Sequence, residues 1–292
     1  MSPREVAPDH PAGDVPLIDV HAHFWHPGTG RADWEAPNRA RLRAGARIGI
    51  SCHIGSILGS FGHTSPTYLP SPADVTTGND AMLAIAEGEG SLVRAYVAVN
   101  PNDGRHALDE IERCVARGAI GIKLAASRRA DHPLLDPIAE LAADHGLPVL
   151  HHIWQHRRQE WPGQEASDGV ELARLAGRHP RVWFILAHIG GGGDYRHTFA
   201  AAGDVPNILF DLSGSGVDRG MLDDAVASVG TERLVWGSDI TMETGLAKLL
   251  ALEELGLPPA GLEDVRWRTA ARVFPPGSFA RLGGGVRKAR TA

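Results

Sequence analysis

The sequence predicts an α/β fold, a (β/α)8 TIM barrel in a single domain, and three observations support this expectation. Short apolar runs alternate with stretches of helical periodicity, as they do in repeated strand–helix units. The runs number eight, which is the number of strands in such a barrel. Most are continuously apolar, which is typical of parallel strands buried on both faces. An open doubly wound sheet is the alternative, but no G-x-G-x-x-G motif follows a strand to support nucleotide binding.

The expected strands are short and apolar, and they span residues 17–20, 48–58, 92–99, 120–124, 148–152, 182–188, 208–212 and 234–237. Between them, apolar side chains recur every three or four positions, as they do on the buried face of a helix. This periodicity is clearest at 108–119, 222–229 and 246–255. The order of elements therefore repeats from one end of the chain to the other.

Glycines and prolines interrupt the alternation of strands and helices. Gly118, Gly146 and Gly230 stand where helices are expected to end. Irregular stretches at 24–40 and after Leu58 follow the first two strands. A barrel carries its binding loops at these positions, so we expect these stretches to line a substrate pocket.

The barrel is expected to occupy residues 15–275 of the 292 residues, because no internal repeat or linker divides them. Residues 1–14 are polar and predict a flexible lead, and residues 276–292 predict a flexible basic tail. The tail is expected to be solvated rather than to bind nucleic acid. Charged side chains at 110–113 are expected to form a solvated helix face.

Composition limits the partners and the compartment. The formal net charge of −6 argues against nucleic acid and anionic membranes as partners. Cys52 and Cys114 are too few for a disulfide framework and are expected to be buried fillers in a reducing compartment. No signal peptide and no apolar run of about 18 residues is present, so we expect a cytoplasmic protein. A small molecule is the expected partner, and a homo-oligomer is an open alternative.

The 15 histidines are the most informative residues, and two of them end the first strand. His21 and His23 are two residues apart, so in a strand they point to the same face. Two neutral imidazoles one pleat apart can bind one cation. An isolated pair of this kind more often forms ordinary hydrogen bonds than a metal site. The residues at the other strand ends therefore decide between these two interpretations.

Four more strands carry metal-capable or cationic residues. The fifth ends in His151 and His152, the sixth ends in His188, Asp239 follows the eighth, and Lys123 lies in the fourth. In a barrel the carboxyl ends of the strands converge at one mouth, where active sites lie. Chance would scatter such residues over helices and loops as well. The sequence therefore predicts a metal site at this mouth.

These strand ends resemble a known family when they are taken together. The matching segments are Leu-Ile-Asp-Val-His-Ala-His at 17–23, Gly-Ile-Lys-Leu at 121–124, Pro-Val-Leu-His-His at 148–152, Ala-His-Ile-Gly-Gly at 187–191 and Trp-Gly-Ser-Asp at 236–239. They resemble the amidohydrolase superfamily, in the amidohydrolase-related branch that includes aminocarboxymuconate semialdehyde decarboxylase-like proteins. The resemblance covers residues 17–275 approximately and implies a metal-dependent barrel enzyme.

The resemblance also implies roles for individual residues. His21, His23, His152 and Asp239 match the metal ligands, and Asp239 can also take a proton from the metal-activated water. His188 matches an acid–base residue of this branch. This donor set suits one Zn²⁺ ion, with Mn²⁺ or Fe²⁺ as alternatives. His151 is expected to face the opposite side of its strand.

The substrate-binding residues are less determined. Lys123 has three open roles: a bridge between two metals when carbamylated, a contact to a substrate carboxylate, or an ordinary buried ion pair. Trp25, Trp154 and Arg157 follow strand ends and are expected to help form an aromatic and cationic pocket for an anionic substrate. His53 is expected to be a hydrogen-bonded core residue.

Two reactions fit this site, and hydrolysis is the first. A metal-activated water would attack an ester, lactone or amide of a small, carboxylate-bearing substrate. Decarboxylation is the alternative, and a non-catalytic metal-binding scaffold is a third hypothesis that the intact ligand set disfavours. In related resorcylate-type decarboxylases a glutamate often replaces the first histidine, so His21 favours hydrolysis or semialdehyde-type decarboxylation. Ile240 and Thr269 stand where the family often has proline and asparagine, which weakens the transfer of one specific activity.

Overall fold

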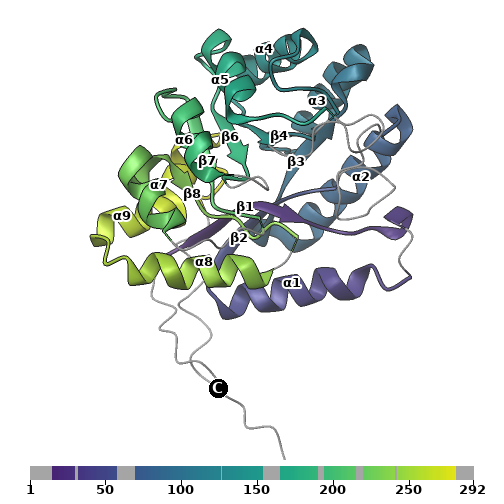
Figure 1. The fold of residues 1–292 in the computed structure, drawn as a ribbon. Coiled ribbons are helices and arrows are strands. Elements are labelled where there is room, and N and C mark those ends of the chain that lie inside the picture. Colours follow the sequence, from purple (N-terminus) through teal and green to yellow (C-terminus); the bar gives the residue numbers. More distant parts are fainter. Residues whose placement is uncertain are drawn as a thin grey trace, which may run out of the picture.

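A computed structural model describes residues 15–29, 32–57, 70–125, 127–153, 165–189, 194–214, 220–240 and 242–280. Within these residues, eight parallel strands form one sheet in which each strand pairs with the next along the chain. The strands are β1 Leu17–His23, β2 Ile50–Ser56, β3 Val93–Val99, β4 Gly121–Leu124, β5 Val149–His152, β6 Phe184–Ala187, β7 Ile208–Asp211 and β8 Leu234–Val235. The predicted single-domain barrel is therefore confirmed, and each expected strand is present (Figure 1).

The barrel closes between β1 and the short β8. The amide of Val20 donates to the carbonyl of Trp236 at 3.0 Å, and the amide of Asp239 donates to the carbonyl of His21 at 2.7 Å. An isolated bridge pairs Ala22 with Asp239. The first and last strands therefore meet along a seam beside the predicted metal ligands.

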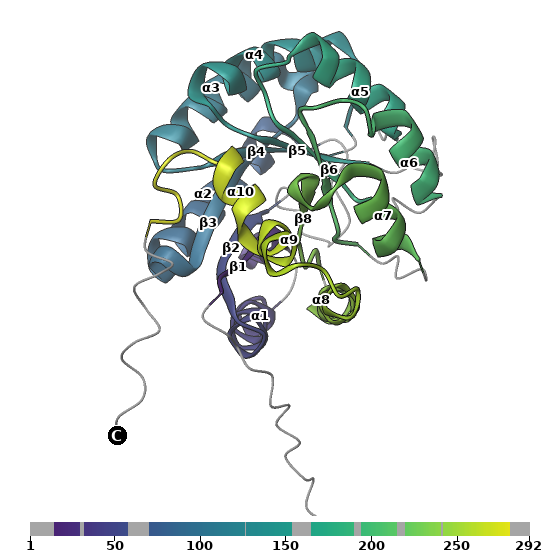
Figure 2. The same ribbon diagram turned by 90° about the vertical axis from the view of Figure 1, so that its left-hand side faces the viewer.

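Helices surround the sheet (Figure 2). In the described residues, one helix follows each of the eight strands, and two more helices come after α8. The helices are α1 Glu35–Arg47, α2 Pro72–Glu89, α3 Gly104–Ala116, α4 Asp136–His145, α5 Gly169–Arg178, α6 Tyr195–Ala202, α7 Met221–Val229, α8 Met242–Glu254, α9 Pro259–Glu263 and α10 Thr269–Val273. One-turn 3₁₀ helices lie at Pro27–Thr29, Gly90–Leu92, Pro101–Asp103, Pro133–Leu135 and Thr231–Arg233, and a π-helical turn lies at Asp264–Arg268.

Local sequence explains where these helices begin and end. The side chain of Ser71 accepts a hydrogen bond from the amide of Asp74 at the start of α2, and the Asp74 carboxylate accepts one from the amide of Ser71. Asp168 and Glu171 form the same reciprocal cap at the start of α5. At the end of α4, Gly146 adopts φ +63°, a left-handed conformation that glycine takes without strain.

Apolar side chains form two layers, one inside the barrel and one between strands and helices. Successive side chains of β5 belong to different layers: Val149 packs toward the helices, whereas Leu150 packs inside the barrel. At one end, Val273 and Phe274 join the interior cluster, so α10 and the residue after it close that end of the barrel. The metal-capable residues lie at the other end, where the strands finish.

The structure corrects two expectations about local structure. The stretch 24–40 is not irregular throughout, because α1 begins at Glu35. Glu110 is buried at 3% exposure instead of lying on a solvated face, because it bridges α3 to α2. Cys52 and Cys114 are free and buried, as predicted.

The expected lead at 1–14 and most of the expected tail lie outside the described residues. Of the tail residues that the structure describes, Ser278 and Phe279 contact the barrel. The carbonyl of Ser278 accepts a hydrogen bond from Arg94 at 3.2 Å, and the Phe279 ring lies 5.7 Å from the Phe274 ring. Among the residues that the structure covers, no helix combines the length and the apolar character needed to cross a membrane.

Candidate metal centre

The two histidines of β1 face one another at the mouth of the barrel. Their Nε2 atoms are 3.1 Å apart, and the rings meet edge-on. The pairing register between β1 and β2 shifts between Asp19 and Ala22, so β1 is irregular around His21. His21 is buried, and the side chain of His23 is 13% exposed.

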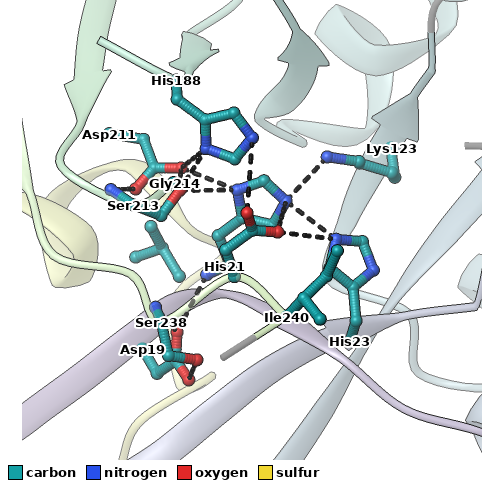
Figure 3. Close-up of polar contacts among 12 residues, drawn as sticks. Asp19, His21, His23, Lys123, His188, Asp211, Ser213, Gly214, Ser238 and Ile240 are labelled. Atoms are coloured by element: carbon teal, nitrogen blue, oxygen red, sulfur yellow. Dashed lines mark hydrogen bonds and ion pairs between the residues drawn. The ribbon is translucent and has the colours of Figure 1, made fainter. Parts of the chain in front are cut away.

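The ends of β6 and β8 add two further donors. Donor atoms of His21, His188 and Asp239 lie within 4.8 Å of one another. The carboxylate of Asp239 lies 3.7 Å from His188 Nε2 and 3.4 Å from His23 Nε2. His188 also stacks on His21 with ring centroids 5.0 Å apart, so three strand ends surround one point (Figure 3).

The two histidines of β5 face opposite sides of the strand. The ring of His152 packs edge-on against His188, with centroids 5.0 Å apart. His151 turns away, and its Nδ1 bonds to the carbonyl of His152 at 2.9 Å. The group within 4.8 Å thus contains His188, expected as an acid–base residue, while His152, expected as a ligand, adjoins it.

Lys123 brings a cationic group to the same place. Its Nζ lies 2.9 Å from His21 Nε2, and the side chain is buried at 1% exposure. Burial lowers the pKa of Lys123 to about 7. At neutral pH this lysine is therefore close to its midpoint, and its charge responds readily to a neighbouring anion.

Sequence reasoning missed Asp211, the last residue of β7. Its carboxylate accepts a hydrogen bond from His21 Nδ1 at 2.7 Å, and burial raises the pKa of Asp211 to about 7. A carboxylate on one ring nitrogen directs the lone pair of the other nitrogen toward a metal. The position of Asp211 at the end of a predicted strand was the sequence signal that could have identified it.

Ser213 joins these groups. Its hydroxyl donates to Asp211 and accepts from His188 Nδ1 at 2.7 Å. The Nδ1 atoms of His21 and His188 are thereby engaged, and His21 Nε2 faces Lys123 (Figure 3). His188 Nε2 faces Asp239.

The protonation states also suit a cation. Burial lowers the pKa of His188 to about 4 and holds the pKa of His21 and His152 well below the ordinary value. Burial alone would raise the pKa of Asp239, but His188 and His23 outweigh it and hold that pKa well below its usual range. At neutral pH the site therefore presents neutral imidazoles and one carboxylate.

The donor spacing agrees with this chemistry. Ligands about 2.0–2.1 Å from a tetrahedral cation lie about 3.3 Å from one another. The separations of 3.1 Å between His21 and His23 and 3.4 Å between His23 and Asp239 are close to that value. Imidazole and carboxylate are ligands for Zn²⁺, Mn²⁺ or Fe²⁺, so the residues present fit such a group.

The expected pocket residues are only partly described. Trp25 is held through its main chain, because its amide and carbonyl both bond to the Asn38 side chain at 2.9 Å. Trp154 and Arg157 lie outside the described residues. His53 is buried, and its Nδ1 bonds to Asp19 at 2.8 Å, as expected for a core histidine.

Comparison with known families identifies the chain. A family model described as amidohydrolase matches residues 18–275. The chain belongs to the amidohydrolase family. This match spans the whole barrel and includes each strand that contributes to the candidate amidohydrolase site.

Several solved structures share the fold of this chain. A 2,6-dihydroxybenzoate decarboxylase from Rhizobium is 18% identical with a TM-score of 0.65, covering 89% of this chain and 98% of that one. A 5-carboxyvanillate decarboxylase from Sphingomonas paucimobilis is 17% identical with a TM-score of 0.63, covering 89% and 99%. A putative amidohydrolase from Staphylococcus aureus is 16% identical with a TM-score of 0.68, covering 88% and 99%. A search of curated proteins found no match.

Proposed function

We propose that this amidohydrolase family member is a metal-dependent decarboxylase of small, carboxylate-bearing substrates. The observation that carries the proposal is the group of His21, His188 and Asp239 donors with the Lys123 amine beside it. The sequence alone placed hydrolysis first and decarboxylation second. The structural neighbours favour the second, because several of them are decarboxylases of aromatic acids.

We assign the cation to His21, His23, His152 and Asp239, with His188 as the acid–base residue. Mn²⁺ and Zn²⁺ both suit this set, and a dihydroxybenzoic acid decarboxylase from Polaromonas with the same fold contains bound manganese. When bound, the cation supplies positive charge and Lewis acidity that attract a carboxylate-bearing substrate. Lys123 supports the same preference, since its amine gains a proton more readily beside an anion.

Decarboxylation replaces a carbon–carbon bond with a carbon–hydrogen bond, so the chain must deliver one proton as CO₂ leaves. Two contacts of His188 support a role in this transfer. Its Nδ1 is held by Ser213 at 2.7 Å, and its Nε2 faces Asp239 at 3.7 Å. In this proposal His188 Nε2, the lone-pair nitrogen of the neutral ring, takes up a proton from water or from the substrate and passes it to the carbon that loses CO₂.

The experiment is metal analysis followed by a screen of hydroxylated benzoic acids and unsaturated semialdehyde acids, monitored for CO₂ and for new carboxylic acid. We expect CO₂ release and, in D₂O, one deuterium on the carbon that carried the carboxyl group. His188→Asn is the matched negative control. Ester, lactone or amide cleavage without CO₂ would instead identify a hydrolase and overturn the proposal.

A further inference from the structure

The carboxylate of Asp239 depends on an unusual turn after β8. Asp239 has φ +56°, a left-handed conformation that residues other than glycine seldom adopt. In this conformation its amide donates to the carbonyl of His21 at 2.7 Å, and its carboxylate reaches His23 and His188. A conformation of this kind persists only where the surrounding structure holds it.

Arg41 of α1 provides three hydrogen bonds to this turn. Its Nη2 donates to the carbonyls of Asp239 and Ile240, each at 2.6 Å. Its Nη1 donates to the hydroxyl of Ser238 at 2.5 Å. One buried guanidinium therefore contacts three consecutive residues of the turn, and its planar fork fixes their relative positions.

Asp19 of β1 also holds this turn. Its carboxylate accepts from the Ser238 amide at 2.9 Å and from the Ser238 hydroxyl at 2.6 Å. It also accepts from the amide of His21 at 3.2 Å and lies 3.9 Å from Arg41 Nη1. The buried positive charge of Arg41 is thereby balanced, and the turn is tied to β1 (Figure 3).

We infer that Arg41 is a positioning residue of the metal centre: it holds the turn that aims the Asp239 carboxylate at the histidines. Arg41 contacts main-chain oxygens and the Ser238 hydroxyl, so its effect on the cation passes through Asp239. The inference rests on the proposed function only in that the site binds a divalent cation.

The test compares Arg41→Ala and Arg41→Lys with Arg43→Ala, whose arginine is exposed on the same helix. The dissociation constants of folded metal-free proteins for Mn²⁺ and Zn²⁺ are measured by chelator competition, with circular dichroism as the check of folding. We expect Arg41→Ala to bind about 10–100-fold more weakly, as when hydrogen-bond partners of metal ligands are lost. Added guanidinium below denaturing concentrations should restore part of this affinity.

Arg41→Lys keeps the charge without the fork, so its dissociation constant should lie between those of Arg41→Ala and the wild type. It also replaces Arg41→Ala in the test if that variant does not fold. Arg43→Ala should bind as the wild type does.

An unchanged metal affinity in both Arg41 variants overturns the inference, even if their thermal stability falls. Wild-type protein that binds the cation but releases no CO₂ contradicts the proposed function instead, and it leaves the affinity comparison intact. The two failures are therefore distinguishable.

Discussion

At the scale of single residues, the centre depends on hydrogen bonds made on the far side of its donors. Asp211 holds His21 Nδ1 at 2.7 Å, and Ser213 holds His188 Nδ1 at 2.7 Å. These contacts fix which nitrogen of each ring carries a proton, so the opposite nitrogen is a lone-pair donor before any cation arrives. In the proposed centre these contacts would prepare His21 to bind the cation and His188 to accept a proton.

Asp211→Asn should weaken metal binding by about 10–100-fold, because a neutral amide polarises the His21 ring less than a carboxylate does. Chelator competition with the folded variant measures the change. Asp223→Asn, at an exposed position on α7, is the matched control. Equal affinity in Asp211→Asn and the wild type would show that Asp211 only packs against the ring.

His188→Asn and His23→Asn separate chemistry from metal binding. We expect His188→Asn to retain the cation and to lose about 10²–10⁴ in turnover, the usual effect of removing an acid–base residue. His23→Asn should lower both metal content and activity. Metal analysis of the purified variants beside their rates decides the roles. If His188→Asn emptied the site as His23→Asn does, His188 would be a ligand, as its place in the 4.8 Å group allows.

The sequence revealed the residues that depend on local periodicity, and missed those that depend on long-range contacts. His21 and His23 were evident because strand pleating places them together. Asp211 and Arg41 were not, because their partners lie 190 and 197 positions away in sequence, at His21 and Ser238 respectively. Only the closed barrel brings these pairs together.

At the scale of secondary-structure elements, α1 packs through polar and small residues. Its buried positions are Asn38, Arg41 and Gly45. For this reason apolar periodicity did not predict the helix, whereas it did predict α3, whose buried face includes Ile111. A Cβ at Gly45 would lie 2.6 Å from His53 Nε2, so the missing side chain lets the helix approach β2 closely.

Gly45→Ala and Gly88→Ala should have opposite effects on stability. Alanine is favoured over glycine in a helix by up to about 1 kcal/mol, and at Gly88 a Cβ would meet no atom within 4 Å. At Gly45 the clash with His53 should instead lower the free energy of unfolding by about 1–3 kcal/mol. Urea denaturation of both variants measures the difference. An increase in stability for Gly45→Ala would disprove the close-approach explanation.

Glu110 joins α3 to α2 through a charged network. Its carboxylate accepts from Asn79 at 2.9 Å and from two nitrogens of Arg113 at 2.8 Å. Burial alone would raise the pKa of Glu110, but the hydrogen bonds from Arg113 and Asn79 outweigh it and lower that pKa. The ionised form is therefore the one that stabilises the fold.

Glu110→Gln should lower the free energy of unfolding by about 1–2 kcal/mol at neutral pH. Because the folded-state pKa of Glu110 is depressed, the wild-type advantage is complete above the unfolded pKa of about 4.3 and disappears as the pH falls through the lower folded value. Urea midpoints of both proteins from pH 7 to pH 3 test this. A difference that stayed constant over that range would count against a role for the charge.

At the scale of the whole molecule, the candidate ligands come from β1, β5 and the segment after β8, so a bound cation would tie distant parts of the barrel together. The amide and bridge contacts of Asp239 lie on the seam between the first and last strands. Stability of the barrel and occupancy of the site are therefore expected to be coupled.

Removing the cation with a chelator should lower the melting temperature. A ligand at 100 times its dissociation constant stabilises the folded state by about 2.7 kcal/mol. Scanning calorimetry with and without EDTA measures the shift, and adding Mn²⁺ or Zn²⁺ back should reverse it. His23→Asn should show little or no shift. An equal shift in that variant would place the stabilising cation elsewhere.

The seam also sets when the centre can form during protein synthesis. A ribosome completes His21 and His23 early, whereas Asp239 emerges only after all eight strands and helices α1 to α7 have been made. A nascent chain that stops before β8 has neither the closing strand nor the carboxylate. A chain interrupted before β8 would therefore lack the Asp239 carboxylate and could not form the complete proposed centre.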